Sequence, residues 1–92
     1  SALSLQPVAL SARFNFALAL DKAGYYRDAA NEQEKVLRDY PDEPRAHLAL
    51  ANLYAQQLNL APLARTHYLK LLELQPQHPQ GTNIRYWLQA NR

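Results

Sequence analysis

A Pro-x-x-Pro unit occurs twice in the chain, first as Pro41 and Pro44 and then as Pro76 and Pro79. Pro76 follows Pro41 by 35 positions, and Pro79 follows Pro44 by the same number. A fixed period of this size is typical of chains built from stacked helical repeats. The spacing therefore constrains the fold more strongly than any other feature of the sequence.

The proline pairs have a competing interpretation as ligands for a proline-reading domain of the SH3 type. Such a ligand needs an exposed polyproline segment with a flanking basic residue, and Arg45 does flank Pro44. However, one explanation covers both pairs: each pair ends one helix and starts the next, because proline stops a helix but suits its first position. We therefore interpret the prolines as boundaries between helices.

The sequence favours helix almost throughout. It has 2 glycines, is rich in Ala, Leu, Gln, Arg and Glu, and has no sustained strand-like alternation of apolar residues. Pro7 suits a first helical position, and Gly24 suits a helix C-terminus because glycine adopts left-handed backbone angles without steric cost. We predict an all-α chain of five helices with short connectors, at about 8–23, 26–38, 44–57, 62–74 and 80–90.

Composition narrows the classes of function. The 92 residues are 48% hydrophobic and 20% charged, which is typical of one small globular domain. A net charge of +2 does not indicate nucleic acid or a membrane surface as the partner, although residues 44–92 alone carry five basic side chains against one acidic. No apolar run is long enough to span a membrane. Because methionine is absent, we expect the chain to be a piece of a longer protein.

The residues between the prolines resemble the tetratricopeptide repeat, a helix-turn-helix unit patterned W-x-x-L-G-x-x-Y, then A-x-x-x-F, then P. The second copy reads His47-x-x-Leu50-Ala51-x-x-Tyr54, Ala64-x-x-x-Tyr68 and Pro76, with one extra residue in the turn around Asn59. The first reads Arg13-x-x-Phe16-Ala17-x-x-Leu20, Ala29-x-x-x-Gln33 and Pro41, and a third begins as Ile84-x-x-Trp87-Leu88.

This resemblance implies a right-handed superhelical stack of helix-turn-helix repeats. The expected divisions are a tail or helix extension at 1–10, repeats at 11–43 and 44–78, and a capping helix or incomplete third repeat at 79–92. In such a stack, small residues at Ala17, Ala29, Ala51 and Ala64 let paired helices approach. Large residues at Phe16, Leu50, Tyr54 and Tyr68 fill the space between pairs.

The resemblance also implies a concave groove that binds peptides or a partner's helix. Carried over residue by residue, the groove positions are Phe14, Asn15, Leu18, Lys22, Arg45, Leu48, Asn52 and Gln56. One branch of the family clamps a C-terminal carboxylate with a lysine and two asparagines. Phe14 and Leu18 stand where that clamp needs Lys and Asn, so we instead expect an apolar or amphipathic segment with one acidic or amide contact.

No pattern in the chain indicates an enzyme, a cofactor or a metal site. There is no cysteine, no glycine-rich phosphate loop and no G-x-S-x-G motif. His47, His67 and His78 fall on different predicted segments, which favours surface histidines over a zinc site. We therefore expect a non-enzymatic scaffold that binds a protein or peptide, with self-association or stacking in a longer repeat protein as the alternative.

Overall fold

The computed structural model describes the backbone of residues 2–92 and the side chains of residues 10–92. Over that range every regular element is helical, which confirms the predicted all-α class and the five helices. The elements in chain order are α1 (Ala2–Lys22), α2 (Tyr26–Asp39), α3 (Pro44–Asn52), η1 (Leu53–Gln57), α4 (Ala61–Leu74) and α5 (Gly81–Ala90). Element η1 directly continues α3, so the two form one rod.

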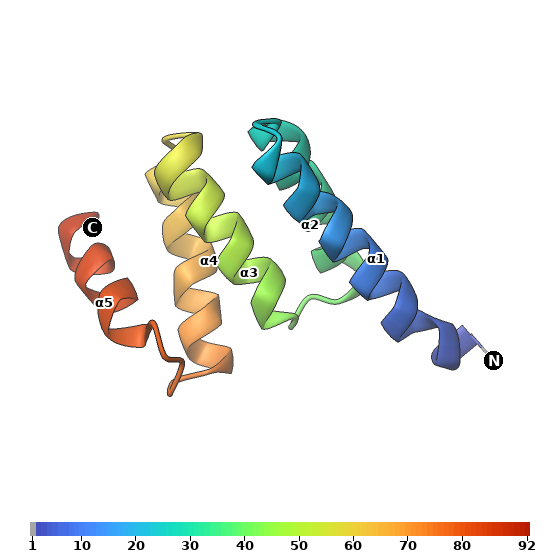
Figure 1. The fold of residues 1–92 in the computed structure, drawn as a ribbon. Helices are drawn as coiled ribbons and strands as arrows, with labels where there is room; N and C mark the ends of the chain where they lie inside the picture. Colours follow the sequence, from blue (N-terminus) through green and yellow to red (C-terminus); the bar gives the residue numbers. More distant parts are fainter. Residues whose placement is uncertain (1) are drawn as a thin grey trace.

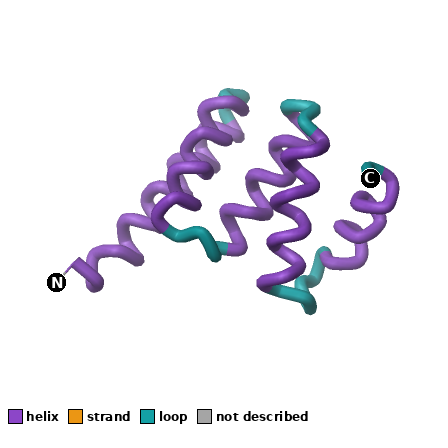
Figure 2. Tube along the Cα trace, turned by 180° about the vertical axis from the view of Figure 1, so that it is seen from behind, coloured by secondary structure: helices purple, strands orange, loops and turns teal. Residues whose placement is uncertain are grey.

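The helices are arranged as two hairpins followed by a single helix. Helix α1 packs along α2, α3 packs along α4, and α2 joins the hairpins through its contacts with α3 and η1. Figure 1 shows α1 and α3 in front of α2 and α4, with α5 beside α4 at the far end from the N-terminus. In the view from behind, the turns that close the two hairpins lie at the same end of the molecule (Figure 2).

Most helix boundaries follow the sequence signals. Gly24 has a positive φ of 91° after α1, and α2 and α4 end two residues before Pro41 and Pro76. Pro44 is the first residue of α3, and the Glu43 side chain before it accepts a hydrogen bond from the Arg45 backbone N–H. A carboxylate in this position both caps the free N–H groups and suits the positive end of the helix dipole.

The start of α1 differs from the prediction. The helix begins at Ala2 and not near Pro7, because the residues before the proline are good helix formers, and residues 2–10 are therefore an extension of the helix.

The predicted helix 44–57 changes its hydrogen-bonding pattern at Leu53. The turn from Leu53 to Gln57 is a π-helix, in which Leu58 N–H donates to the Leu53 carbonyl at 2.8 Å. Asn59 follows with a positive φ of 57°, which is uncommon for a residue other than glycine. A π turn takes up more residues than an α turn. The extra residue that the sequence places around Asn59 therefore coincides with a wider helical turn just before it.

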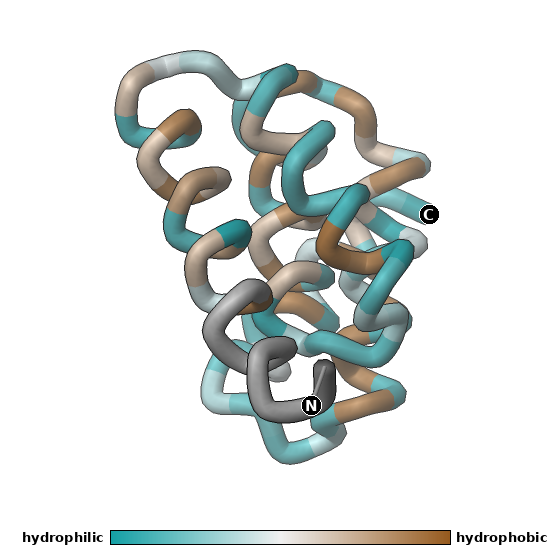
Figure 3. The backbone as a smooth tube through the Cα atoms, turned by 90° about the vertical axis from the view of Figure 1, so that its right-hand side faces the viewer, coloured by the Kyte–Doolittle hydropathy of each residue, from teal (hydrophilic) through white to brown (hydrophobic). Residues whose placement is uncertain are grey.

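One core runs through both hairpins and reaches α5. The small residues Ala17, Ala29, Ala51 and Ala64 are all buried where paired helices meet, as predicted. Figure 3 shows hydrophobic positions recurring along the helices between hydrophilic ones. The buried core cluster consists of Ala29, Ala30, Leu50, Ala51, Leu53, Tyr54, Ala64, Tyr68, Leu71 and Ile84.

The prediction for Phe16 was wrong. This side chain was expected to fill the space between helix pairs, but 53% of its surface is exposed. Leu50, at the matching position of the second hairpin, is fully buried. The reason is that α2 covers this flank of α3, whereas within residues 10–92 no helix covers the same flank of α1.

Candidate functional site

The residues predicted to line the groove lie on α1 and on the rod formed by α3 and η1. The apolar members Phe14, Leu18 and Leu48 are half-buried, which leaves part of each side chain open to a partner. The polar members Asn15, Lys22, Arg45 and Gln56 are exposed, and Asn52 is half-buried.

Two of these residues, one from each helix, are in direct contact. The Arg45 guanidinium carbon lies 5.1 Å from the centre of the Phe14 ring, within the range of a cation–π interaction. Arg45 is also held by Glu43, whose carboxylate accepts from Arg45 Nε at 3.2 Å and from Nη2 at 3.3 Å. The arginine is thus fixed between an aromatic ring on α1 and the cap of α3.

The pKa values of Glu43 and Arg45 reflect this pairing. Partial burial by itself would raise the pKa of the Glu43 carboxyl, but the hydrogen bonds from Arg45 outweigh it and leave that pKa below its ordinary value. The hydrogen bond to Glu43 in turn raises the pKa of Arg45. Both groups are therefore charged at neutral pH, and the cation beside Phe14 is permanent.

Asn52 is tied to the second hairpin. Its side-chain oxygen accepts a hydrogen bond from the Tyr68 hydroxyl on α4, which leaves the amide NH₂ as the group that can donate to a partner. No side-chain hydrogen bond or ion pair joins Asn15, Leu18, Lys22 or Gln56 to the other groove positions within the described side chains. The structure therefore brings together Phe14 with Arg45 and ties Asn52 to Tyr68.

The prediction of surface histidines was wrong for His47, which is buried, and for His67, which is largely covered. Their Nδ1 atoms lie 3.0 Å apart, which joins α3 to α4. His47 Nε2 lies 2.7 Å from the Pro41 carbonyl, and His67 Nε2 lies 3.9 Å from a Glu34 oxygen. We call His47, His67, Glu34 and Tyr54 the histidine cluster, because the Tyr54 hydroxyl also donates to Glu34 at 2.6 Å.

The partners of the cluster fix the positions of its protons. A backbone carbonyl can only accept, so His47 carries its proton on Nε2 and its Nδ1 accepts. His67 must then donate from Nδ1, which leaves His67 Nε2 as the position where a further proton would face Glu34.

Burial dominates the electrostatics of the cluster. It lowers the pKa of His67, and the charge of Glu34 opposes that effect while His47 adds to it. Burial also raises the pKa of the Tyr54 hydroxyl, and the hydrogen bond to Glu34 raises it further. His67 is thus neutral at neutral pH, and Tyr54 is a fixed donor.

The cluster lies where the two hairpins meet. Glu34 lies on α2 and Pro41 follows it, whereas both histidines belong to the second hairpin, so the cluster links the two hairpins. Among the described residues, no three His, Cys, Asp or Glu side chains are placed to hold a metal ion. Sequence reasoning missed the cluster because its members are far apart in the chain. The one available signal was His47, which stands where the repeat pattern has a large buried residue.

A cavity of about 750 Å³ lies elsewhere than the predicted groove. It runs along α2 and is lined by Phe16 and Leu20 of α1, by Tyr54 of η1 and by charged residues of α2. A smaller cavity of about 200 Å³ lies at the turn before α4. Neither was predicted from the sequence, because both depend on how the hairpins pack.

None of the described helices is both long enough and apolar enough to cross a membrane. Comparison of the chain with protein-family models, with curated protein sequences and with solved structures finds no match.

Proposed function

We propose that this chain is a non-enzymatic protein-binding scaffold made of two tetratricopeptide-like repeats and a capping helix. In this proposal the hairpins form a right-handed stack, and the face formed by α1 and α3 binds an extended peptide or an amphipathic helix of a partner. The two-hairpin arrangement, the buried alanines between paired helices and the 35-residue proline spacing support it.

The observation that carries the proposal is the contact between Arg45 and Phe14. It gives a surface formed by two successive hairpins, with a fixed cation and an aromatic ring at its centre. Leu18 and Leu48 add partly exposed apolar surface, and the Asn52 amide adds a donor. Aromatic and arginine side chains often contribute most of the binding energy in protein interfaces. Such a surface suits a segment with apolar side chains and one carboxylate or amide oxygen.

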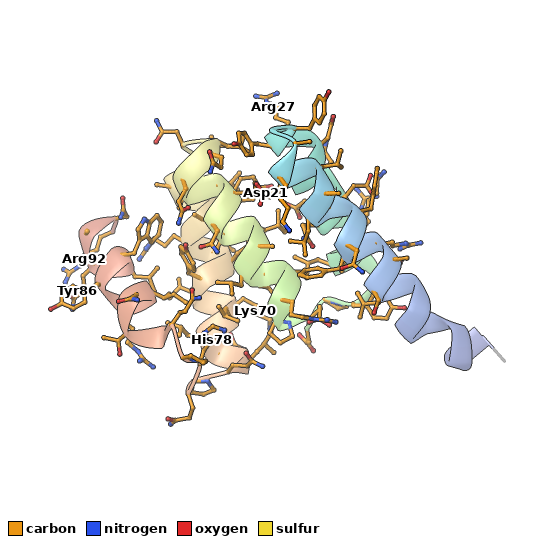
Figure 4. All side chains as sticks on the ribbon, viewed as in Figure 1. Asp21, Arg27, Lys70, His78, Tyr86 and Arg92 are labelled. Atoms are coloured by element: carbon orange, nitrogen blue, oxygen red, sulfur yellow. The ribbon has the colours of Figure 1, made fainter. Side chains whose placement is uncertain are left out.

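A capture experiment tests the groove. The double variant Phe14→Ser with Asn52→Asp removes the ring and the amide donor, while the new carboxylate still accepts from Tyr68 and keeps α3 tied to α4. We expect this variant to keep its helical circular dichroism and to capture less of the partner that the parent protein retains. The matched control is Tyr86→Ser on α5, an aromatic side chain that is 72% exposed and projects away from the hairpins (Figure 4). Equal capture by the groove variant and the control would reject the groove.

The alternative function, self-association or stacking, rests on the exposed flank of α1. Phe16 is large, apolar and 53% exposed, and the matching flank of α3 is fully covered. An uncovered repeat flank of this kind suits a further helical hairpin, including one from a second copy of the chain. Sedimentation velocity over a wide concentration range tests this function. A monomer that is independent of concentration removes it, whereas association that Phe16→Ser abolishes supports it.

A further inference from the structure

The turn that closes the second hairpin and the start of α4 carry three leucines. The stretch reads Leu58-Asn59-Leu60-Ala61-Pro62-Leu63, whereas the corresponding stretch of the first hairpin, 35 residues earlier, has no leucine and reads Ala23-Gly24-Tyr25-Tyr26-Arg27-Asp28. Leu60 is 41% exposed and Leu63 is 46% exposed. Turns at the surface are usually polar, and each of these leucines leaves almost half of its side chain open to a partner.

The backbone holds the two leucines in place. The π turn ends at Gln57, and after the left-handed residue Asn59 the Leu60 N–H donates to the Tyr54 carbonyl at 2.7 Å. The Leu60 carbonyl then accepts from the N–H groups of Leu63 and Ala64, both at 3.1 Å. Because these bonds fix the turn, little conformational entropy remains to be lost when a partner covers it.

The leucines border the cavity of about 200 Å³. Leu58, Leu60, Leu63 and Tyr54 line it from the second hairpin, and Ala30, Asn31 and Arg27 line it from α2. This size suits one leucine or phenyl side chain of a partner. The cavity lies at the end of the molecule where both hairpins turn, and Figure 4 shows Arg27 projecting there.

Arg27 gives the cavity its charge preference. It is exposed, and no hydrogen bond or ion pair to it occurs among the described side chains, in contrast to Arg13, Lys35, Arg45 and Lys70. Its neighbour Asp28 does not line the cavity. An unpaired guanidinium at the edge of an apolar cavity favours a carboxylate beside the inserted side chain.

We propose that this turn is a second docking site, for an acidic amphipathic segment of a partner protein. The segment inserts one leucine or aromatic side chain between Leu60 and Leu63 and places a carboxylate on Arg27. The site shares no residue with the face formed by Phe14, Arg45 and Asn52, so it either binds a second segment of the same partner or acts independently. A single arginine among leucines does not match the row of cations that a phosphate backbone requires.

The test is a titration of the protein with two synthetic helical peptides, followed by fluorescence anisotropy. Both peptides carry the same leucines on one face, and the flanking residues are glutamate in one and lysine in the other. We expect saturable binding of the glutamate peptide and at least about tenfold weaker binding of the lysine peptide. Leu60→Ser and Leu63→Ser should each weaken the glutamate peptide about fivefold, because each removes roughly half of a leucine's burial. Arg27→Glu should reverse the preference between the peptides.

Two matched control variants distinguish binding at this site from nonspecific binding to exposed apolar or cationic side chains. Leu69→Ser removes a leucine of α4 that is 48% exposed and does not line the cavity. Arg65→Glu reverses an exposed cation of α4 that also lies outside the cavity. Both should leave the affinity and the peptide preference unchanged. Equal binding of the two peptides, no saturable binding, or a loss with Leu69→Ser as large as with Leu63→Ser would overturn the proposal.

Discussion

The first helices of the two hairpins carry similar patterns in different surroundings. Leu50 and His47 on α3 are buried, whereas Phe16 and Arg13 at the corresponding positions of α1 are exposed. Helix α2 lies against α3 and covers it, and that coverage is what turns an apolar position into core. The comparison teaches that the repeat pattern specifies which residues can be buried, while the neighbouring hairpin decides which of them are.

The largest expected difference between the hairpins is the effect of truncating their matching apolar residues. Leu50→Ala should lower the free energy of unfolding by about 2–5 kcal/mol, because it leaves a cavity in a fully enclosed position. Phe16→Ala should lower the free energy of unfolding by only about 1 kcal/mol, because the ring is 53% exposed and only the remainder of its apolar surface is buried. Urea denaturation followed by circular dichroism measures both. A large loss with Phe16→Ala would mean that something covers α1 in solution.

The second helices of the hairpins differ at Gln33 and Tyr68. The Tyr68 hydroxyl donates to Asn52, but the Gln33 side-chain oxygen is buried with no hydrogen-bond partner among the described residues. Gln33→Met keeps the unbranched shape and removes the unsatisfied group, so it should raise the free energy of unfolding by about 1–2 kcal/mol. Tyr68→Phe is the matched control and should lower it, because it leaves Asn52 without its donor. If Gln33→Met lowers the free energy of unfolding in the same denaturation assay, the Gln33 side-chain oxygen does accept a hydrogen bond in solution and the prediction is wrong.

The free energy of unfolding should depend on pH through His67, which lies where the two hairpins meet. Burial lowers the pKa of His67 below 6.5, so the unfolded chain takes up a proton more readily than the folded protein does. Stability is therefore full above pH 6.5 and falls as the pH drops through and below that value. Denaturation midpoints measured between pH 7.5 and pH 5 follow this change.

Two variants assign this pH dependence to the histidine cluster. His67→Gln should flatten the profile between pH 6.5 and pH 5, because the titrating group is gone. Glu34→Gln should steepen it, because the Glu34 charge is the group that raises the pKa of His67 against burial. A profile that His67→Gln leaves unchanged would place the pH dependence elsewhere in the molecule.

The sequence was sufficient to predict the helices and most of their ends, because prolines, Gly24 and the cap at Glu43 act locally. It left open whether the residues before Pro7 form a tail or extend α1, and it could not predict that the rod after Asn52 becomes a π turn. The small buried residues such as Ala51 and Ala64 were predictable because close helix packing requires them at fixed positions.

The candidate sites were less predictable, because they depend on which helices become neighbours. The resemblance pointed to Phe14, Arg45 and Asn52 one by one, and only the packed hairpins show that Arg45 stacks on Phe14 and that Asn52 is bonded to Tyr68. The pairing of His47 with His67 joins two helices across a turn of irregular geometry. No periodicity in the chain specifies such a pairing.

The smallest expected effect concerns the ion pair at the exposed flank of the first hairpin. Arg13 on α1 pairs with Asp39 at the end of α2. His47, at the matching position of α3, is instead bonded to the Pro41 carbonyl. Arg13 and Asp39 are both about half exposed, so solvent and salt screen their attraction. A double-mutant cycle with Arg13→Ala and Asp39→Ala should give a coupling energy of about 0.5 kcal/mol or less, which falls further in concentrated salt. A coupling well above that value would mean that this flank of α1 is shielded from water as the matching flank of α3 is, and the contrast between the hairpins would then rest on Phe16 alone.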